Sequence, residues 1–230
     1  MELLIQENLQ YSDMVSVTLF IYWKALNRTI RKVYFKGNQM KKNGRNWDSD
    51  IILLDRVQWE GHQLMFRYTA HNYYDLVINQ SDGSFKITLV KKPFDEPFYK
   101  TPDDTDKLFQ PWWDDVKAWG IIVNEQIIAV IETAVEQWSN RLIVTELWID
   151  DNHRRKGIAT ALMDIAKKRA IDENRRVLML ETQSCNEGAI AFYLHYGFEL
   201  IGFDKCAYQN NDVDRKEVRI NLGILINDKR

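Results

Sequence analysis

The sequence contains little cysteine and no histidine pattern of the kind that binds metal. Its 230 residues include only two cysteines, Cys185 and Cys206, which are too few and too far apart for a disulfide scaffold or a zinc knuckle. None of the four histidines has metal-ligand spacing. We therefore expect two reduced, partly buried thiols and no metal.

Long apolar runs and a dominant charge are also missing. The longest apolar run, residues 14–23, is about half the length of a membrane span and is interrupted by Ser16 and Thr18. The acidic N-terminus lacks the cationic start of a secretory signal. A net charge of -2 argues against a general nucleic-acid binder, which would carry a basic face. We expect a cytoplasmic protein without a membrane or nucleic-acid partner.

The length and patterning favour one standard domain with an appendage. Turn residues at 60–61 and 82–83 separate short β-type segments, which predict strands at 51–54, 63–68, 74–78 and 84–90. Residues 18–26 fit either a helix or a buried strand. Four prolines then punctuate residues 93–111, where we expect no regular structure. We expect residues 1–70 to form a β-rich N-terminal extension of unknown role, and residues 71–230 to form the main domain.

From residue 119 onwards the pattern is α/β. A hairpin turn at 124–125 joins predicted strands at 120–123 and 127–133, and a third strand is predicted at 142–149. Apolar residues at helical spacing predict a helix from Gly157 to about residue 171, with that face in the core. The remaining predicted elements are a strand at 177–182, a helix from residue 187, and strands near 198–201 and 218–222.

The loop between the third of these strands and the first helix is suited to holding phosphate. Three cations, Arg154, Arg155 and Lys156, precede Gly157 at this strand-to-helix turn. Backbone N–H groups at a helix start have no partner within the helix, and the helix dipole is positive there. A pyrophosphate can accept those hydrogen bonds. Gly157 removes the Cβ that would hold a phosphate away from the backbone, and Ala159 keeps the next turn thin.

Residues 154–159 resemble the Arg/Gln-x-x-Gly-x-Gly/Ala loop of the GCN5-related N-acetyltransferases (GNAT). A second motif follows the next predicted strand, where Asn186, Ala189 and Tyr193 match Asn-x-x-Ala-x-x-x-Tyr and residues 197–198 supply a terminal Gly-Phe. The resemblance implies an α/β (α+β) fold with a mixed, mostly antiparallel central sheet flanked by helices. It also implies acetyl-CoA as cosubstrate, without a metal. The cofactor-binding residues that it implies are Leu147, Trp148, Ile149, Arg154, Arg155, Lys156, Gly157, Ile158, Ala159, Thr160, Asn186 and Tyr193.

The reaction implied is acetyl transfer from a thioester to an amine. In the resembled family a tyrosine at the position of Tyr193 protonates the departing thiolate; otherwise Tyr193 is a packed core residue. We expect the backbone at Trp148 or Ile149 to donate to the developing oxyanion. Glu146 is the first candidate for the general base and Glu181 the second. For either, a solvated or salt-bridged carboxylate is an equal interpretation.

Softer matches are similar to the streptothricin acetyltransferases. They are residues 180–183 followed by Asn186, residues 202–204 followed by Tyr208, and two Asp-rich stretches at 103–106 and 112–115. They predict substrate contacts at Asp114, Asp115, Asp204 and Tyr208, and a small cationic amine as acceptor. The acidic stretches can equally be solvated loops.

Two other functions remain open at the level of the sequence. One is acetylation of a protein or peptide, which requires an open groove. The other is a non-catalytic acyl-CoA-binding regulatory module. A homodimer is also left open.

Overall fold

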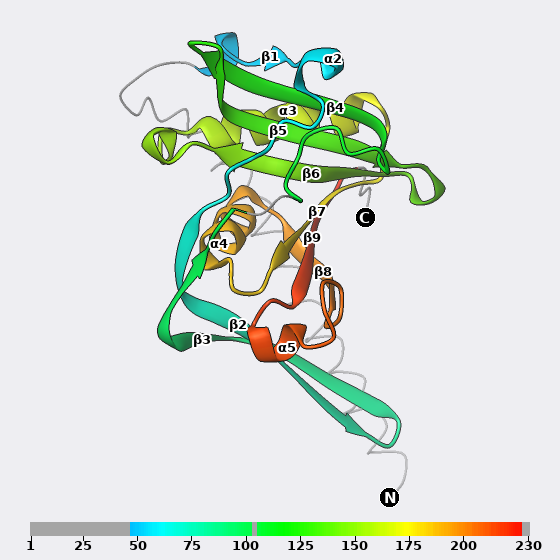
Figure 1. Cartoon of the computed structure of the whole chain (residues 1–230). Helices are drawn as coiled ribbons and strands as arrows, with labels where there is room; N and C mark the ends of the chain where they lie inside the picture. Colours follow the sequence, from blue (N-terminus) through cyan, green and yellow to red (C-terminus); the bar gives the residue numbers. More distant parts are fainter. Residues whose placement is uncertain (1–46, 103–104, 227–230) are drawn as a thin grey trace, which may run out of the picture. The chain divides into compact units, whose positions relative to one another are not determined.

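A mixed seven-stranded sheet forms the centre of the protein, with strand order β1-β4-β5-β6-β7-β9-β8 (Figure 1). The computed structural model describes residues 47–102 and 105–226. The described residues belong to one compact unit. Only β6 and β7 are parallel neighbours in the seven-stranded sheet; its other pairs are antiparallel. The mostly antiparallel sheet predicted from the sequence is confirmed.

The strands of this sheet are β1 (Ile52–Leu53), β4 (Asp114–Val123), β5 (Gln126–Glu136), β6 (Arg141–Ile149), β7 (Val177–Gln183), β8 (Glu199–Asp204) and β9 (Arg219–Leu225). A separate two-stranded sheet consists of β2 (Tyr68–Ser81) and β3 (Ser84–Lys100). The α-helices are α2 (Arg56–Trp59), α3 (Ile158–Asp172), α4 (Glu187–Tyr196) and α5 (Asp212–Arg215). The 3-10 turns are η1 (Trp47–Ser49), η2 (Gln137–Ser139) and η3 (Asp151–His153).

Helix α3 covers one face of the sheet and confirms the helix predicted there. It begins after Gly157, whose φ of 84° lies in the left-handed region that glycine adopts without strain. The buried residues recur every three or four positions and pack against β5, β6 and β7, because that spacing places them on one side of the helix. They are Ile158, Leu162, Met163, Ala166, Arg169 and Ala170.

Strands β6 and β7 separate halfway along their length. Their parallel pairing runs from Arg141–Val177 to Val144–Leu180 and then ends, although both strands continue. At the same place β6 has a bulge, since Glu132 pairs with Glu146 whereas Thr133 pairs with Val144. An extra residue in one strand bends that strand, and here it turns β6 away from β7. The result is an opening in the middle of the sheet.

The hairpin of β2 and β3 is longer than predicted. Its turn at Asp82–Gly83 is confirmed, but β3 continues through Pro93 and Pro97, where we expected no regular structure. That prediction was wrong because both strands of a two-stranded sheet are edges, where a proline need not donate to a neighbour. The two prolines also flank the irregularity opposite Ala70 and Asn72, and proline is tolerated at such bulges.

Residues 47–67 belong to the described unit and contribute β1 and α2. The strand predicted at 63–68 was wrong up to residue 67: Gln63 forms only a single bridge to Lys107. The segment instead packs through Leu64, which is buried and whose N–H donates to Asp106 O (2.8 Å). The other expectations for residues 1–46, including the helix or strand at 18–26, lie outside the described residues.

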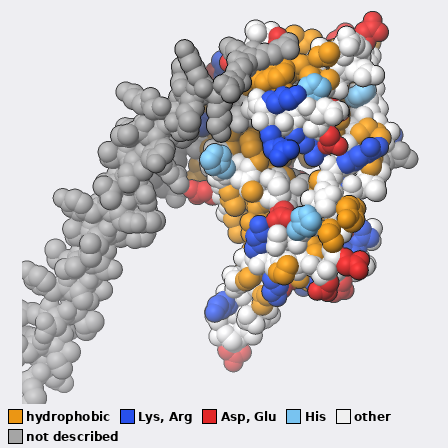
Figure 2. Space-filling model, turned by 90° about the vertical axis from the view of Figure 1, so that its left-hand side faces the viewer, with side chains coloured by type: hydrophobic (Ala, Val, Ile, Leu, Met, Phe, Trp, Pro, Cys, Tyr) orange, Lys and Arg blue, Asp and Glu red, His pale blue; other side chains and the backbone are white. Residues whose placement is uncertain are grey.

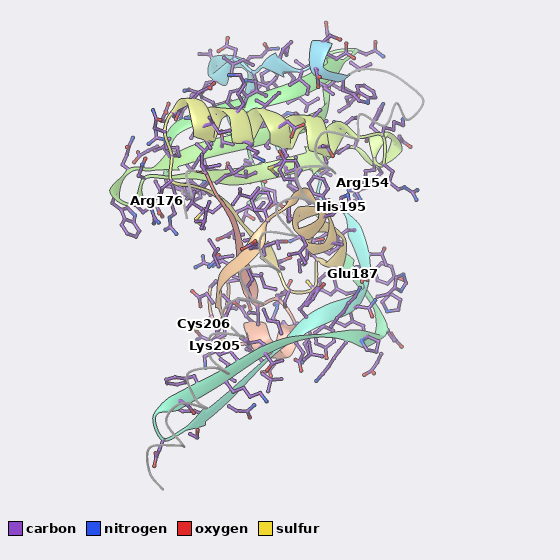
Figure 3. All side chains as sticks on the ribbon, turned by 180° about the vertical axis from the view of Figure 1, so that it is seen from behind. Arg154, Arg176, Glu187, His195, Lys205 and Cys206 are labelled. Carbon is purple, nitrogen blue, oxygen red and sulfur yellow. The ribbon has the colours of Figure 1, made fainter. Side chains whose placement is uncertain are left out.

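Glu187 fastens the base of the hairpin to the first turn of α4 (Figure 3). Its carboxylate accepts from the N–H groups of His71 and Asn72 (2.9 and 3.0 Å) and lies 2.8 Å from Lys91 Nζ. Burial alone would raise the pKa of this carboxyl, but these hydrogen bonds lower it to about 2. Glu187 therefore stays charged and holds the hairpin in place.

Arg169, near the end of α3, connects that helix to β4 and β5. Its guanidinium is almost fully buried, with 4% of the side chain exposed, and donates to Thr133 O, Asp115 Oδ2 and Glu173 Oε1 (3.0, 2.7 and 2.8 Å). Bonds from a single planar group to three segments fix their relative positions. Asp115 is thus part of a structural ion pair.

We expect Arg169→Lys to lower the free energy of unfolding by about 3 kcal/mol, because one ammonium cannot replace this set of buried donors. Chemical unfolding followed by circular dichroism measures the change. Lys168→Ala is the control: Lys168 lies one residue away, is largely exposed and, among the described residues, pairs with Asp172 along the helix, so no measurable loss is expected. Equal stability of the Arg169 variant and the unaltered protein would contradict this role.

Candidate functional site

A pocket of about 250 Å³ lies where β6 and β7 separate. It brings together five of the residues that the sequence indicated, Glu146, Leu147, Glu181, Asn186 and Tyr193. They come from β6, β7, α4 and its N-cap, which are far apart in the sequence. Tyr208, expected to contact the acceptor, also lines the pocket.

The N-terminus of α3 offers unused hydrogen-bond donors. The first bond at the helix start runs from Ala161 N–H to Gly157 O (3.2 Å), and Gly157 has no side chain to cap the turn. Within the described residues the N–H groups of residues 157–160 donate to no protein acceptor. Nothing lies within 4 Å of the place where a Cβ of Gly157 would stand. An anion can therefore approach these four donors closely.

The cations of the loop differ in their contacts. Lys156 Nζ donates back to Asn152 O (2.7 Å), and Lys156 O accepts from the indole of Trp47 (3.0 Å). Arg154 Nε donates to Ile149 O (3.2 Å), which ties the loop to the end of β6. Arg155 has a φ of 60°, and this left-handed backbone sharpens the turn into the helix.

The alternation of the β5–β6 ladder determines which main-chain groups of β6 face the opening. Asp150 N–H donates to Ile128 O (2.9 Å), so this pair is hydrogen-bonded across the ladder. In an antiparallel ladder alternate residues point their main-chain groups towards the same neighbour, so those of Trp148 also face β5. The main-chain groups of Leu147 and Ile149 face the opening instead. This geometry favours Leu147 and Ile149, rather than Trp148, as donors to a bound ligand.

Tyr193 is buried against the rings of Phe192 and Phe198, and it lines the pocket. Burial, and secondarily the charge of Glu146, raise the pKa of its hydroxyl above the ordinary value. The hydroxyl therefore keeps its proton at neutral pH. A group that carries a proton beside a carboxylate in a pocket can serve as a proton donor.

Asn186 occupies the N-cap position of α4 and also lines the pocket. Its Oδ1 accepts from Ala189 N–H (3.3 Å), as a capping side chain does. The two expectations for this residue, helix cap and pocket residue, are thus compatible.

Glu181 and Asp204 share one cation. Arg219 Nη1 lies 3.1 Å from Glu181 Oε2, and Arg219 Nη2 lies 3.3 Å from Asp204 Oδ2. Burial raises the pKa of Glu181 although the charge of Arg219 opposes this. Of the two candidate bases, Glu181 has a salt bridge to Arg219. The charge of Glu146 acts on Tyr193.

Asp114 and Asp115 are not brought to the pocket. They begin β4, beside Val135 and the last turns of α3, and neither is among the residues that line the pocket. The carboxylate of Asp115 is bound by Arg169. Their expected role as substrate contacts stays a prediction that this geometry does not support.

Several pocket residues were not indicated as site residues by the sequence. Phe66, Tyr68 and Lys100 come from the base of the β2–β3 hairpin, and no local pattern marks them. The Tyr68 hydroxyl donates to Gln183 Oε1 (2.9 Å) and so joins the hairpin to β7. Asp106 belongs to the acidic stretch noted in the sequence, which was the only available signal for it.

Among residues 47–102 and 105–226, no group of three or more His, Cys, Asp or Glu side chains is arranged to hold a metal ion. In the same part of the chain, no helix has the length and apolar character needed to cross a membrane. Cys185 is buried and Cys206 exposed, and both are free thiols.

Comparison with solved structures supports the fold. A nourseothricin acetyltransferase superposes with a TM-score of 0.59 at 23% identity, covering 77% of this chain and 99% of that one. A Bacillus anthracis str. Ames protein, solved in complex with acetyl coenzyme A, gives a TM-score of 0.56 at 22% identity. That superposition covers 76% of this chain and 95% of the other. At these identities the likeness concerns the fold.

Comparison of sequences gives a family match for the central part of the chain. A streptothricin acetyltransferase of Escherichia coli is 28% identical over 133 residues, which cover 57% of this chain and 71% of that protein. Residues 87–198 match the model of the acetyltransferase (GNAT) family. These residues include β4 to β7, the loop before α3 and all of α4. Residues 87–198 of this chain therefore form a domain that matches the acetyltransferase (GNAT) family.

Proposed function

We propose that this protein transfers the acetyl group of acetyl-CoA to a primary amine of a small cationic acceptor. A streptothricin-type antibiotic, the substrate named for its relatives, is the first candidate, and its acetylation would confer resistance. Acetylation turns an ammonium into an amide, and polycations that bind RNA depend on such charges.

The observation that carries the proposal is the composition of the pocket beside Tyr193. Asp106, Glu146 and Glu181 supply three carboxylates, and Lys100 is the cation among its lining residues. Tyr68, Tyr208 and Phe66 add aromatic rings. Carboxylates attract an ammonium, and aromatic faces bind it by cation–π contacts. A pocket of about 250 Å³ with this lining supports a small amine more than an extended peptide, which needs a longer groove.

The N-terminus of α3 has the features needed to hold the cofactor. The four unused N–H groups of residues 157–160 would bind its diphosphate. Leu147 and Ile149 would pair with its pantetheine arm as an added strand would. When bound there, acetyl-CoA supplies an activated acetyl group as a thioester.

The amine must lose a proton before it attacks. A lysine-like amine has a pKa near ~10.4, so its neutral form costs about 4–5 kcal/mol at pH 7. Glu146 accepts this proton, directly or through one water, because it lines the pocket and its charge reaches Tyr193. The main-chain donors of β6 stabilise the negative charge that develops on the carbonyl oxygen. Tyr193 gives its proton to the departing thiolate.

The function is tested by supplying the purified protein with acetyl-CoA and following free thiol. The acceptors are streptothricin, aminoglycosides, polyamines and peptides with free amines. We expect thiol release with at least one small cationic amine, and a product whose mass is greater by one acetyl group. Turnover with peptides alone would replace the small acceptor by a protein substrate. Binding of acetyl-CoA without turnover of any amine would instead support the regulatory module.

Gly157→Glu is expected to abolish binding of CoA, because a carboxylate would stand in front of the four N–H donors and repel the diphosphate. Isothermal titration calorimetry with CoA measures the loss. Gly157→Asn is the matched control: asparagine tolerates the left-handed backbone and adds no charge, so its effect should be smaller. An unchanged dissociation constant for the glutamate variant would exclude this loop as the phosphate site.

Tyr193→Phe is expected to lower kcat by about 10²-fold or more, with little change in the affinity for acetyl-CoA, since only the proton donor is lost. Steady-state kinetics with the best acceptor of the screen measures both parameters. Tyr196→Phe is the control on the same helix, because its hydroxyl donates to Asp164 (2.6 Å) and Tyr196 does not line the pocket. Equal kcat for the Tyr193 variant and the unaltered enzyme would remove Tyr193 from the proton-donor role.

A further inference from the structure

A second cavity, of about 600 Å³, adjoins the acetyl-transfer pocket and has the opposite charge. Three segments form it: the start of β2, the end of β3, and the turn between β6 and α3. Its lining residues are Arg67, Tyr68, Thr69, Tyr99, Lys100, Thr101, Pro102, Asp151, Arg154 and Arg155. Four of them are cations and one is acidic. We name it the cationic cavity.

The contacts of these side chains leave positive charge available in the cavity. Asp151, the acidic member of the lining, lies 2.8 Å from Arg154 Nη2 and is thereby neutralised. Arg154 also donates to Arg67 O (2.9 Å), so this guanidinium joins the loop to the base of the hairpin. Within the described part of the chain, Arg67 and Arg155 form no ion pair. Two arginines that line a cavity and have no ion-pair partner among the described residues indicate an anionic ligand.

The cationic cavity and the pocket that contains Tyr193 adjoin each other. Tyr68 and Lys100 line both of them, so the cationic cavity leads to the pocket that contains Tyr193. Figure 2 shows the side of the molecule that lies on the left in Figure 1, and Lys and Arg side chains gather near the middle of this face. A ligand that extends through both cavities would carry negative charge at one end and react at the other. Acetyl-CoA has this polarity, with phosphates at one end and a thioester at the other.

We propose that Arg67 and Lys100, from the base of the β2–β3 hairpin, bind phosphate groups of the cofactor together with the loop before α3. The inference rests on the proposed function, because it takes acetyl-CoA as the ligand. It adds residues that lie outside both family motifs. An arginine binds phosphate through two parallel N–H bonds, which gives orientation as well as charge.

The hairpin is anchored well enough to serve as a wall of a binding site. Glu187 holds the N–H groups of His71 and Asn72, and Tyr68 bonds to Gln183, so the base of the hairpin is fixed to both α4 and β7. The backbone of this segment is therefore already ordered before a ligand binds, and this lowers the entropic cost of binding.

The test compares ligands that differ only in their phosphates. The affinities of CoA, dephospho-CoA and pantetheine are measured by isothermal titration calorimetry for the unaltered protein, Arg67→Ala and Arg67→Lys. We expect Arg67→Ala to weaken CoA about tenfold or more and to leave pantetheine, which has no phosphate, unchanged. Arg67→Lys should be intermediate, because it keeps the charge and loses the paired donors.

Lys86→Ala is the matched control, since Lys86 is an exposed cation near the tip of the same hairpin and outside the cavity. It should leave the affinity for CoA unchanged. If Arg67→Ala weakens CoA but not dephospho-CoA, Arg67 binds the 3′-phosphate; if it weakens both, Arg67 binds the diphosphate.

Two results would overturn the inference: equal affinity of Arg67→Ala and the unaltered protein for CoA, or an equal loss for CoA and pantetheine. Both leave the proposed function intact, because the unaltered protein still binds CoA. Failure of the unaltered protein to bind CoA at all would instead remove the proposed function, and the inference with it.

Discussion

The separation of β6 from β7 is the constraint on which the site depends. It coincides with the bulge at Thr145, whose hydroxyl donates to Glu132 Oε1 (2.8 Å). Glu132 is fully buried, and its other oxygen accepts from Phe109 N–H (2.6 Å). Burial raises the pKa of Glu132 despite these hydrogen bonds. A buried carboxyl group without hydrogen-bond partners costs free energy, so both oxygens of Glu132 have to stay bonded. The two hydrogen bonds therefore hold β6 and the segment before β4 at a defined separation.

The opening places two environments of opposite charge next to each other. One is lined by Asp106, Glu146 and Glu181, and the other by Arg67, Arg154 and Arg155. Tyr68 stands between them and links the hairpin to β7. This layout suits a cationic acceptor on one side and a phosphate-bearing donor on the other, with Tyr193 beside the acidic pocket. The β2–β3 hairpin then contributes to cofactor binding as well as to the shape of the pocket.

Much of the α/β part could be predicted because its signals are local. The turn at residues 124–125 has left-handed backbone at both positions, Gly157 starts a helix, and Asn186 caps one, as their residue types indicated. Predictions failed where tertiary contacts, rather than the local sequence, determine the secondary structure. In the sequence, Pro93 and Pro97 indicated a break, yet they fit β3, which is an edge strand of a two-stranded sheet.

By itself, the sequence determined the positions of the main helices and strands from residue 119, the phosphate-type loop and the likeness to the family. These depend on neighbouring residues and on spacing along the chain. Only the tertiary structure decided which acidic residues line the pocket. Asp106 and Asp115 belong to similar acidic stretches, but one lines the pocket and the other is held by Arg169. The partner of a charge depends on which segments the fold brings together, and that information is not local.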